Sequence, residues 1–473
     1  MSPKPTQTTP QSIPAPAPYQ NRFMAPNDFS EIHLNAYQTD TTSVIGPASK
    51  GVQNLQQVKI APPGIAGSLA FNKAGQIVTI RVGADNSQEL LLLDPARLNV
   101  IARTELPRRS NPTGQVSFSG GGYFYLNAES QVVCVTADAQ IRIYRSVAAP
   151  PGPLPFQFDP VRAIDLSGVI ASDDILNSVL PDSDGNLWFI SHAAVVGYAK
   201  YGTADIEHIT IPSIVRDAPT ITKSFATDGD RGVYVVTDQA LYRFEATPGG
   251  PKAIWHAVYD AGTRTKLGQN QRGSGTTPTC FDDSGNNKFV TITDNVDPLM
   301  HVNVYDRKTG RLVAQQEVFQ EFPYISSCEN SLIAVNHSII VENNFNNVNT
   351  QSTLTSLTTV PGVNRVDFDP SIQDPKKNAR VVWENNSVAI PSVVSQLSTG
   401  DGCIYTYAKS PQGWYWAALD YNTGKIRAQT EIVPWSNEKD GSDANNFYSG
   451  LGIGPDGTAY VGVFGGIVAW RGF

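Results

Sequence analysis

One short phrase recurs along the chain and limits the folds that it can adopt. The phrase consists of small or acidic residues, a glycine, and then a run of β-forming residues. It occurs at Asp182–Gly185 before NLWFIS, at Thr227–Gly229 before GVYVVT, and at Gly454–Gly457 before TAYVGV. Acidic-glycine turns between apolar runs are typical of β-hairpins. The phrase therefore predicts many short antiparallel strands.

The spacing of the phrase predicts the architecture. The glycines at positions 185 and 229 are 44 residues apart, and those at 402 and 457 are 55 apart. The intervals 75–185 and 285–402 are 110 and 117 residues, about two periods each, and both contain a degenerate copy. This period suits one four-stranded blade. We predict an all-β fold, a β-propeller of eight, or alternatively seven, four-stranded antiparallel blades. Its last strand should pair with chain near residues 52–65, because ring closure removes exposed strand edges.

A second phrase follows an apolar strand and precedes another strand. Its clearest copies are Asp306–Gly310 (DRKTG) and Asp420–Gly424 (DYNTG). In this repeat the chain, from about Gly67 to Phe473, resembles the PQQ-type (quinoprotein) and YncE-like β-propellers. The resemblance implies the fold, and it keeps a quinoprotein-like oxidoreductase as an alternative function. The tryptophan that docks blades in quinoprotein alcohol dehydrogenases is absent after both turns, where Ala314 and Ala428 stand.

Charge and composition exclude several classes of partner. The net charge is −8 and no basic patch stands out, so we expect no nucleic-acid partner. No apolar stretch approaches the ~18 residues of a membrane span. Walker and Rossmann motifs are absent, which argues against a nucleotide cofactor. We expect a monomer that acts on a small-molecule or oligosaccharide substrate.

The N-terminal part of the chain differs from the repeats. Residues 1–26 are rich in Pro, Thr and Gln, which predicts a disordered segment. Residues 27–473 are predicted to form a single propeller domain, with a non-blade N-terminal arm at 27–51 that has a structural role. The first stretch resembles a linker after a cleaved signal peptide, so we predict a secreted or periplasmic protein.

The chain has four cysteines, at positions 134, 280, 328 and 403. No CxxC spacing is present, which argues against a structural zinc site. Cys280 and Cys328 are one repeat apart, which predicts a disulfide between adjacent blades. The alternative is that all four are buried free thiols.

Polar residues gather around positions 273–345, where the innermost strands should line the central channel. Acidic residues next to asparagines supply the oxygen ligands that Ca²⁺ prefers. The candidate metal ligands are Asp294, Asn295, Glu329, Asn330, Glu342 and Asn343. The alternative is that these are turn residues, a common role of Asn and Asp.

Candidate catalytic groups are taken from the same region and from the few histidines. Asp294 and Glu329 would carry charge, and His301 or His192 could act as general base. The candidate substrate-binding residues are Thr276, Thr277, Trp414 and Trp416. A G-x-S-x-G nucleophile elbow is absent.

The function predicted from these features is that of a secreted propeller enzyme. It would act at the central channel on a small or oligomeric substrate by Ca²⁺-assisted hydrolysis or lysis. A non-catalytic propeller that binds a ligand, glycan or protein is the first alternative, and the quinoprotein-like oxidoreductase is the second.

Overall fold

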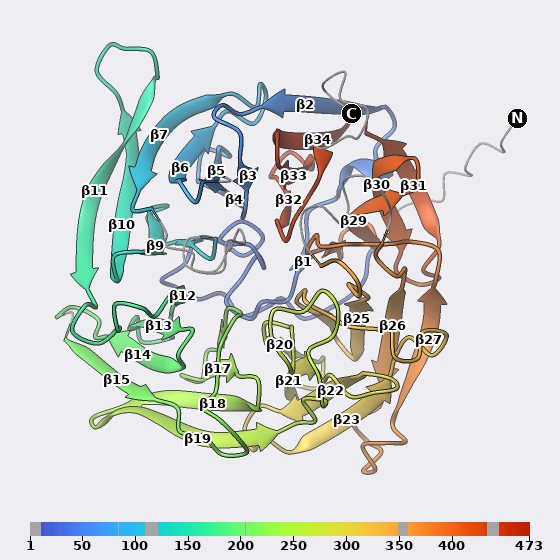
Figure 1. Cartoon of the computed structure of the whole chain (residues 1–473). Helices are drawn as coiled ribbons and strands as arrows, with labels where there is room; N and C mark the ends of the chain where they lie inside the picture. The colour runs from blue at the N-terminus through green and yellow to red at the C-terminus, as the bar shows by residue number, and fades with distance from the viewer. Residues whose placement is uncertain (1–10, 84, 109–121, 204, 349–357, 433–443) are drawn as a thin grey trace, which may run out of the picture.

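Eight β-sheets stand in a ring around a central axis (Figure 1). The computed structural model describes residues 11–83, 85–108, 122–203, 205–348, 358–432 and 444–473. The predicted β-propeller is confirmed, with eight blades rather than seven. Within the described residues, no helix has the length and apolar character needed to cross a membrane.

The first four blades follow the chain order, each from the innermost to the outermost strand. Blade I contains β3 (Ile65–Ala66), β4 (Ala70–Phe71), β5 (Ile77–Val82), β6 (Gln88–Leu93) and β7 (Val100–Leu106). Blade II contains β8 (Tyr125–Leu126), β9 (Val132–Thr136), β10 (Gln140–Ala148) and β11 (Phe156–Asp165). Blade III contains β12 (Leu176–Pro181), β13 (Leu187–Ser191), β14 (Val195–Ala199) and β15 (Ile206–Thr210). Blade IV contains β16 (Ala226–Thr227), β17 (Val233–Val236), β18 (Ala240–Thr247) and β19 (Gly250–Val258).

The remaining four blades include two strands from the start of the chain. Blade V contains β20 (Thr279–Asp282), β21 (Lys288–Thr293), β22 (His301–Asp306) and β23 (Leu312–Glu317). Blade VI contains β24 (Ile333–Val335), β25 (Ser338–Glu342), β26 (Val363–Phe368) and β27 (Ala379–Asn385). Blade VII contains β28 (Gln396–Ser398), β29 (Cys403–Ser410), β30 (Gly413–Asp420) and β31 (Ile426–Glu431), with β1 (Thr41–Thr42) added in parallel to β28. Blade VIII contains β32 (Leu451–Ile453), β33 (Ala459–Val463), β34 (Gly466–Gly472) and β2 (Gln53–Lys59), and a 3₁₀ turn, η1 (Pro47–Ser49), precedes β2.

Blade VIII closes the ring with strands from both ends of the chain. β2 is its outermost strand and pairs antiparallel with β34, with Leu55 opposite Trp470. This is the closure that the sequence predicted for residues 52–65. It joins the first and the last long strands in one sheet.

The D-x-x-T-G turns are built by their own side chains. Asp306 Oδ1 accepts hydrogen bonds from the backbone N–H of Thr309 at 2.8 Å and from its hydroxyl at 2.7 Å. Gly310 adopts φ of 72°, the left-handed region that favours glycine. The indole of Trp255 from blade IV packs on this glycine, and its Nε1 donates to Arg307 O at 3.0 Å. A Cβ at position 310 would lie 2.7 Å from the Trp255 ring.

The second such turn is docked in the same way. Trp383 from blade VI packs on Gly424 of blade VII, and its Nε1 donates to Tyr421 O at 2.9 Å. The expectation that docking tryptophans are missing is therefore wrong. They lie on the outermost strand of the preceding blade and not after the turns that they dock.

The four cysteines are all free and buried. The predicted disulfide between Cys280 and Cys328 is wrong. Cys280 lies within β20, whereas Cys328 precedes β24, and the two side chains belong to different core clusters. Cys328 Sγ donates to Asn330 O at 3.2 Å. A separation of one repeat thus did not give equivalent positions in neighbouring blades.

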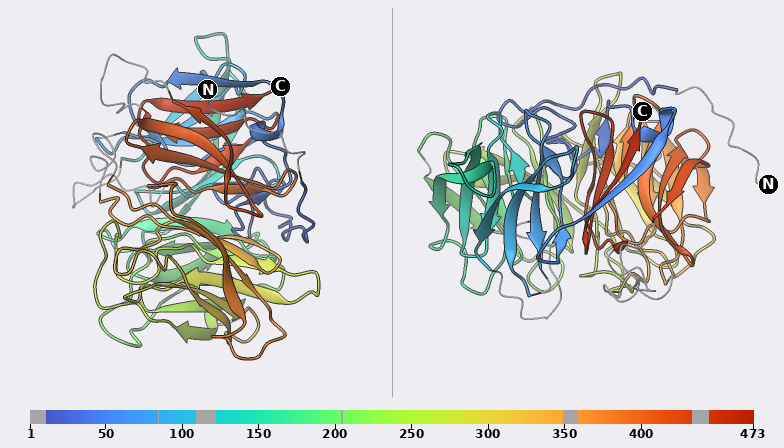
Figure 2. Two further views of the ribbon diagram at one scale, coloured as in Figure 1. Left: turned by 90° about the vertical axis from the view of Figure 1, so that its right-hand side faces the viewer. Right: turned by 90° about the horizontal axis from the view of Figure 1, so that it is seen from above.

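The N-terminal arm (residues 27–51) follows one face of the ring, where the edge-on views show it (Figure 2). Its carbonyl groups accept hydrogen bonds from the inner strands of successive blades. The donor and acceptor pairs are Phe71 N to Phe29 O, Leu126 N to Ser30 O, Thr227 N to Ala36 O, Cys280 N to Tyr37 O, Ala334 N to Thr39 O, and Leu397 N to Asp40 O. The arm therefore lies against the inner strands of six blades on one face of the ring.

Contacts with the propeller begin before the arm. Asn21 is fully buried and donates to Pro181 O at 2.9 Å. Met24 forms an isolated bridge with Asn127. The sequence predicted that residues 1–26 are disordered. Within the described part of this segment, Asn21 and Met24 nevertheless make defined contacts with the propeller. The domain limits themselves stay a prediction.

Candidate functional site in the central channel

A buried chain of hydrogen bonds links the arm to blade VI. His33 Nδ1 lies 3.1 Å from Asp40 Oδ1, and His33 Nε2 lies 3.2 Å from Ser331 Oγ. The exposed fractions of His33, Asp40 and Ser331 are 2%, 0% and 8%. With Nδ1 donating to the carboxylate, Nε2 is free to accept the proton of the serine hydroxyl.

Two tight turns of the arm bring His33 and Asp40 side by side. Leu34 N donates to Glu31 O at 3.0 Å, and Gln38 N donates to Asn35 O at 2.9 Å. Leu34, Gln38 and Asp40 have φ of 76°, 62° and 52°. Such values are uncommon for non-glycine residues and tend to occur where a structure positions a functional group.

A second carboxyl group lies beside this chain. Glu31 is 3% exposed and accepts from Gln38 Nε2 at 2.9 Å. Burial raises the pKa of Glu31 to about 8, so it is largely protonated at neutral pH. Burial alone would lower the pKa of His33, but the charge of Asp40 and its hydrogen bond raise it above its usual value. His33 is therefore a stronger base than an isolated imidazole.

A buried ion pair lies near this polar chain. Lys223 Nζ is 2.7 Å from Glu329 Oε2, with side-chain exposures of 7% and 1%. Burial raises the pKa of Tyr123, and the same phenol is influenced by the charges of Lys223, Glu329 and Asp40. Its ring also stacks with His33 at a centroid distance of 6.4 Å. Tyr123 thus connects the ion pair with the Asp40–His33–Ser331 chain.

Two carbonyl oxygens beside the chain lack a hydrogen-bond partner among the described residues. They are Oε1 of Gln38, which is fully buried, and Oδ1 of Asn330, which is 2% exposed. Buried polar atoms of proteins are nearly always hydrogen-bonded, so each calls for a water molecule or a ligand group. Gln38 is hydrogen-bonded to Glu31, and Asn330 lies between Glu329 and Ser331 in the sequence.

The arrangement can support nucleophilic catalysis. A serine hydroxyl, an imidazole and a carboxylate in hydrogen-bonding order form the constellation of serine hydrolases, which is recognised by geometry and occurs on unrelated folds. Sequence reasoning missed all three residues. His33 and Asp40 stand in an arm that was given a structural role, and Ser331 lies 298 residues from His33. The available signal was the presence of His33 and Asp40 in a segment that has no blade pattern.

The predicted metal ligands are found in separate hydrogen-bonded pairs. Asp294 Oδ2 lies 2.7 Å from His301 Nδ1, and Asn330 Nδ2 donates to Glu342 Oε2 at 2.8 Å. Glu329 is paired with Lys223. Within the described residues, no group of three or more His, Cys, Asp or Glu side chains is placed to hold a metal ion. The calcium site at these donors therefore stays a prediction.

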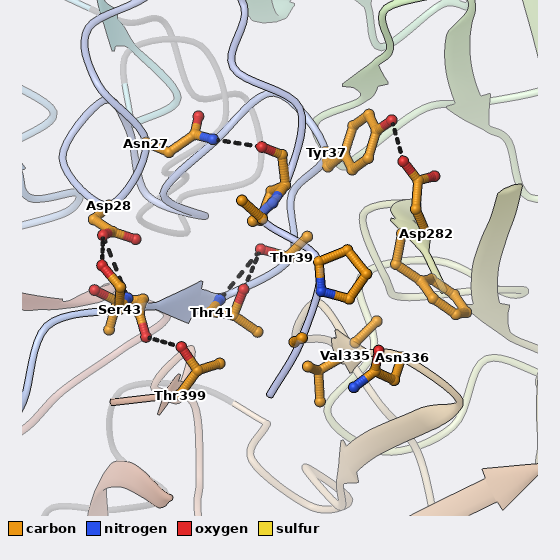
Figure 3. A pocket seen from close by; sticks show the side chains of 17 residues that line it. Asn27, Asp28, Tyr37, Thr39, Thr41, Ser43, Asp282, Val335, Asn336 and Thr399 are labelled. Carbon is orange, nitrogen blue, oxygen red and sulfur yellow. Dashed lines mark hydrogen bonds between the residues drawn. The ribbon is translucent and has the colours of Figure 1, made fainter. Parts of the chain in front are cut away.

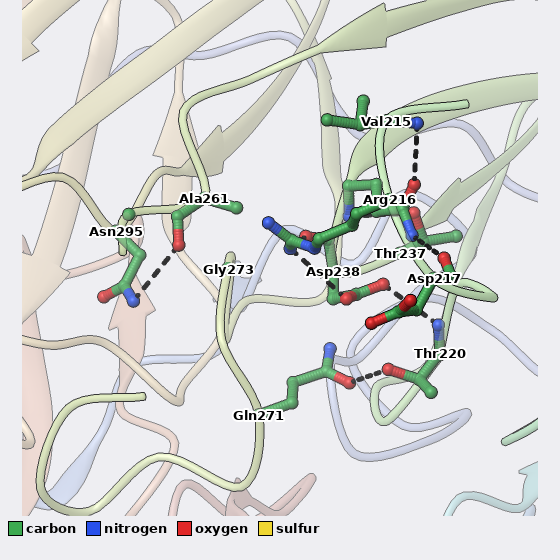
Figure 4. A network of polar contacts seen from close by, with 12 residues as sticks. Val215, Arg216, Asp217, Thr220, Thr237, Asp238, Ala261, Gln271, Gly273 and Asn295 are labelled. Carbon is green, nitrogen blue, oxygen red and sulfur yellow. Dashed lines mark hydrogen bonds and ion pairs between the residues drawn. The ribbon is translucent and has the colours of Figure 1, made fainter. Parts of the chain in front are cut away.

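The remaining predicted ligands tie loops together. Asn295 Nδ2 donates to Ala261 O at 3.5 Å and to Arg264 O at 3.2 Å. Figure 4 shows this amide turned toward Ala261, across Gly273 from the ion pair of Arg216 with Asp238. The Oδ1 atom of Asn343 accepts from Ser327 N at 3.1 Å. Both asparagines thus bind backbone groups of neighbouring loops.

The other predicted site residues do not join the polar chain. Thr276 Oγ1 lies 2.9 Å from Ser274 Oγ, and Thr277 is buried. Trp414 and Trp416 belong to the core of blade VII and its neighbours, with exposures of 3% and 0%. His192 is exposed, and its Nδ1 lies 3.2 Å from Ile221 O.

Comparisons with known proteins agree with the fold. No family model matches the sequence. An uncharacterized protein of Archaeoglobus fulgidus is 28% identical over 331 residues, 64% of this chain, and the match spans 63% of that protein's length. A europium-containing methanol dehydrogenase has a TM-score of 0.56 at 12% identity, covering 92% of this chain and 89% of the other.

Two further solved structures extend this result. The quinohemoprotein alcohol dehydrogenase ADHIIG of Pseudomonas putida has a TM-score of 0.55 at 10% identity, with coverage of 94% and 80%. Sqt1 of Chaetomium thermophilum has a TM-score of 0.51 at 12% identity, with coverage of 87% and 97%. The resemblance to PQQ-type propellers is thus confirmed at the level of the fold, and identities this low carry no chemistry.

Proposed function

We propose that this propeller is a hydrolase whose nucleophile is Ser331, with His33 as general base and Asp40 as the residue that orients it. The observation that carries the proposal is the buried hydrogen-bonded chain from Asp40 through His33 to Ser331. The sequence predicted hydrolysis or lysis assisted by Ca²⁺; the present proposal keeps hydrolysis and assigns it to a serine nucleophile in place of the metal.

The reaction would proceed in two steps. Ser331 Oγ attacks an acyl or related electrophilic centre while its proton passes to His33 Nε2, and the leaving group departs with that proton. Water then attacks the covalent intermediate, gives its proton to His33, and restores the Ser331 hydroxyl. The buried ammonium group of Lys223 would stabilise the developing oxyanion.

The test is covalent labelling with a small fluorophosphonate, followed by mass spectrometry of the intact protein and its peptides. We expect one label, on Ser331, and its loss in Ser331→Ala and His33→Gln. The matched control is Ser327→Ala, because Ser327 is a buried serine near Ser331 whose hydroxyl has no partner among the described residues. Labelling of Ser331 that persists in His33→Gln at the wild-type rate contradicts the proposal, and so does the absence of any label.

Two finer predictions remain alongside this proposal. Calcium at the predicted donors is a separate proposal, and none of the steps above depends on it. Secretion is proposed from the composition of the N-terminal segment, and detection of the native protein in the extracellular or periplasmic fraction tests it. The quinoprotein-like alternative has support from the fold alone.

A further inference from the structure

The proline-rich segment before the arm lies against the arm and the inner strands of blades V to VII, with a pocket beneath it. Residues 14–18 read Pro-Ala-Pro-Ala-Pro. A cavity of 290 Å³ lies beneath them, lined on one side by Pro16 and on the other by Tyr37, Phe281 and Asn336. Figure 3 shows the residues that line it.

The segment is held by both of its ends. Ile13 packs against the core cluster of blades VI to VIII, and its backbone N–H donates to Thr399 O at 2.8 Å. At the other end, the ring of Tyr19 lies 5.9 Å from the ring of Tyr37. These contacts fix an apolar anchor and an aromatic anchor on the two sides of the proline stretch.

The carbonyl groups between the anchors are bound by asparagine side chains. Asn336 Nδ2 donates to Pro14 O at 2.7 Å, and Asn27 Nδ2 donates to Pro18 O at 2.9 Å. Proline has no backbone N–H, so carbonyl oxygens are the polar groups that it can offer. Domains that bind proline-rich peptides use this pattern of aromatic surfaces and side-chain donors to carbonyls.

We infer that this groove is a binding site for an extended proline-rich peptide of a protein partner, with the pattern apolar-Pro-x-Pro, and that residues 13–19 occupy it in cis. The groove offers an apolar anchor site, an aromatic anchor site and two amide donors at fixed positions. None of them depends on the identity of the chain that supplies the carbonyls. A partner segment therefore competes with the resident segment for the same contacts.

The test uses the full-length protein and a fluorescein-labelled peptide with the sequence of residues 11–20, QSIPAPAPYQ. Ile13→Asp removes the resident apolar anchor, so we expect this variant to bind the peptide about tenfold more tightly than the wild type in fluorescence polarisation. Val52→Asp, at a side chain that is 68% exposed, is the matched control and should bind like the wild type. Adding Asn336→Ala to Ile13→Asp should weaken the peptide again.

Three outcomes overturn the inference. They are equal binding by the wild type and Ile13→Asp, equal binding of a peptide that carries Asp in place of its isoleucine, and a concentration-dependent wild-type dimer in light scattering that Ile13→Asp abolishes. The last outcome would assign the groove to the N-terminal segment of a second copy of this chain.

Discussion

Glu31 is the residue whose protonation most affects how the arm responds to pH. Its folded pKa is about 8, above the 4.5 of an unperturbed glutamate. The folded protein therefore binds this proton more tightly than the unfolded chain. The stability from this group is complete below about pH 4.5 and is lost as the pH rises toward 8. The pKa of His33 is also raised, so the stability that His33 contributes is likewise lost as the pH rises above 6.5, the usual pKa of histidine.

Glu31→Gln should flatten this pH dependence. The amide keeps an oxygen that can accept from Gln38, and it has no proton to lose. Between pH 5 and 8.5 the unfolding free energy of the wild type should fall by on the order of 3 kcal/mol more than that of the variant. Urea titrations at several pH values measure this difference. If the unfolding free energies of the two proteins changed with pH in parallel, Glu31 would be ionised in the native state.

The Lys223–Glu329 pair allows a test of a buried charge. Glu329→Gln leaves the ammonium group without its counter-charge and should cost about 3 kcal/mol of stability, whereas the double variant with Lys223→Met should recover much of it. The exposed pair of Lys377 and Asp374 is the control, and Asp374→Asn should leave the stability nearly unchanged, because solvent screens this pair.

The wild type and Glu329→Gln also test the prediction that Glu329 is a Ca²⁺ ligand. A melting temperature that rises with added Ca²⁺ in the wild type and not in Glu329→Gln would support coordination. An equal response of both proteins, or none, would leave Glu329 as the partner of Lys223 alone. Thermal melts in chelator and in millimolar Ca²⁺ distinguish these results.

The sequence located polar density but did not determine what the polar side chains bind. Asparagines 295 and 343 were chosen as metal ligands, yet their amides bind the backbone of neighbouring loops. The residue type is the same in both roles, so composition cannot separate them. His33 and Ser331 come together only because the arm crosses the channel, and the spacing of the turns contains no information about that path.

At the level of elements, the turn phrases were informative because their chemistry is local. Gly75, Gly185, Gly402 and Gly457 all have positive φ, as a tight turn between antiparallel strands requires. In two other copies a neighbouring residue takes this conformation instead, Arg231 with φ of 64° and Asn286 with φ of 61°. Blade number could therefore be predicted, whereas the strand limits could not.

The closing strand β2 gives a prediction at the same scale. Leu55 of β2 packs against the core cluster that contains Trp470, whereas Val52, just before β2, is 68% exposed. Leu55→Asp should destabilise the protein by about 2 kcal/mol, since it removes buried apolar area from the closing blade. Val52→Asp should have almost no effect. Denaturant titrations followed by tryptophan fluorescence compare the two, and equal midpoints would mean that β2 contributes little to closure.

For the whole molecule, the state of the cysteines is a direct test of the corrected disulfide prediction. All four thiols are buried, and burial raises the pKa of the Cys134, Cys328 and Cys403 thiols to about 12. The native protein should therefore react very slowly with a thiol reagent such as DTNB. After denaturation without reductant, four thiols per chain should react. A count of two thiols per chain would mean that the other two cysteines form a disulfide.

The course of the arm has a consequence for biosynthesis. Residues that leave the ribosome early depend on residues that leave it much later: Gly46 N donates to Asp401 Oδ2 at 3.1 Å, and β2 pairs with β34. Contacts this distant in sequence form slowly, because the intervening chain must be ordered first. During translation β2 has an open edge and His33 has no serine beside it. Chains that terminate early should therefore be recognised as incomplete through that edge, and no partial product should carry an assembled channel site.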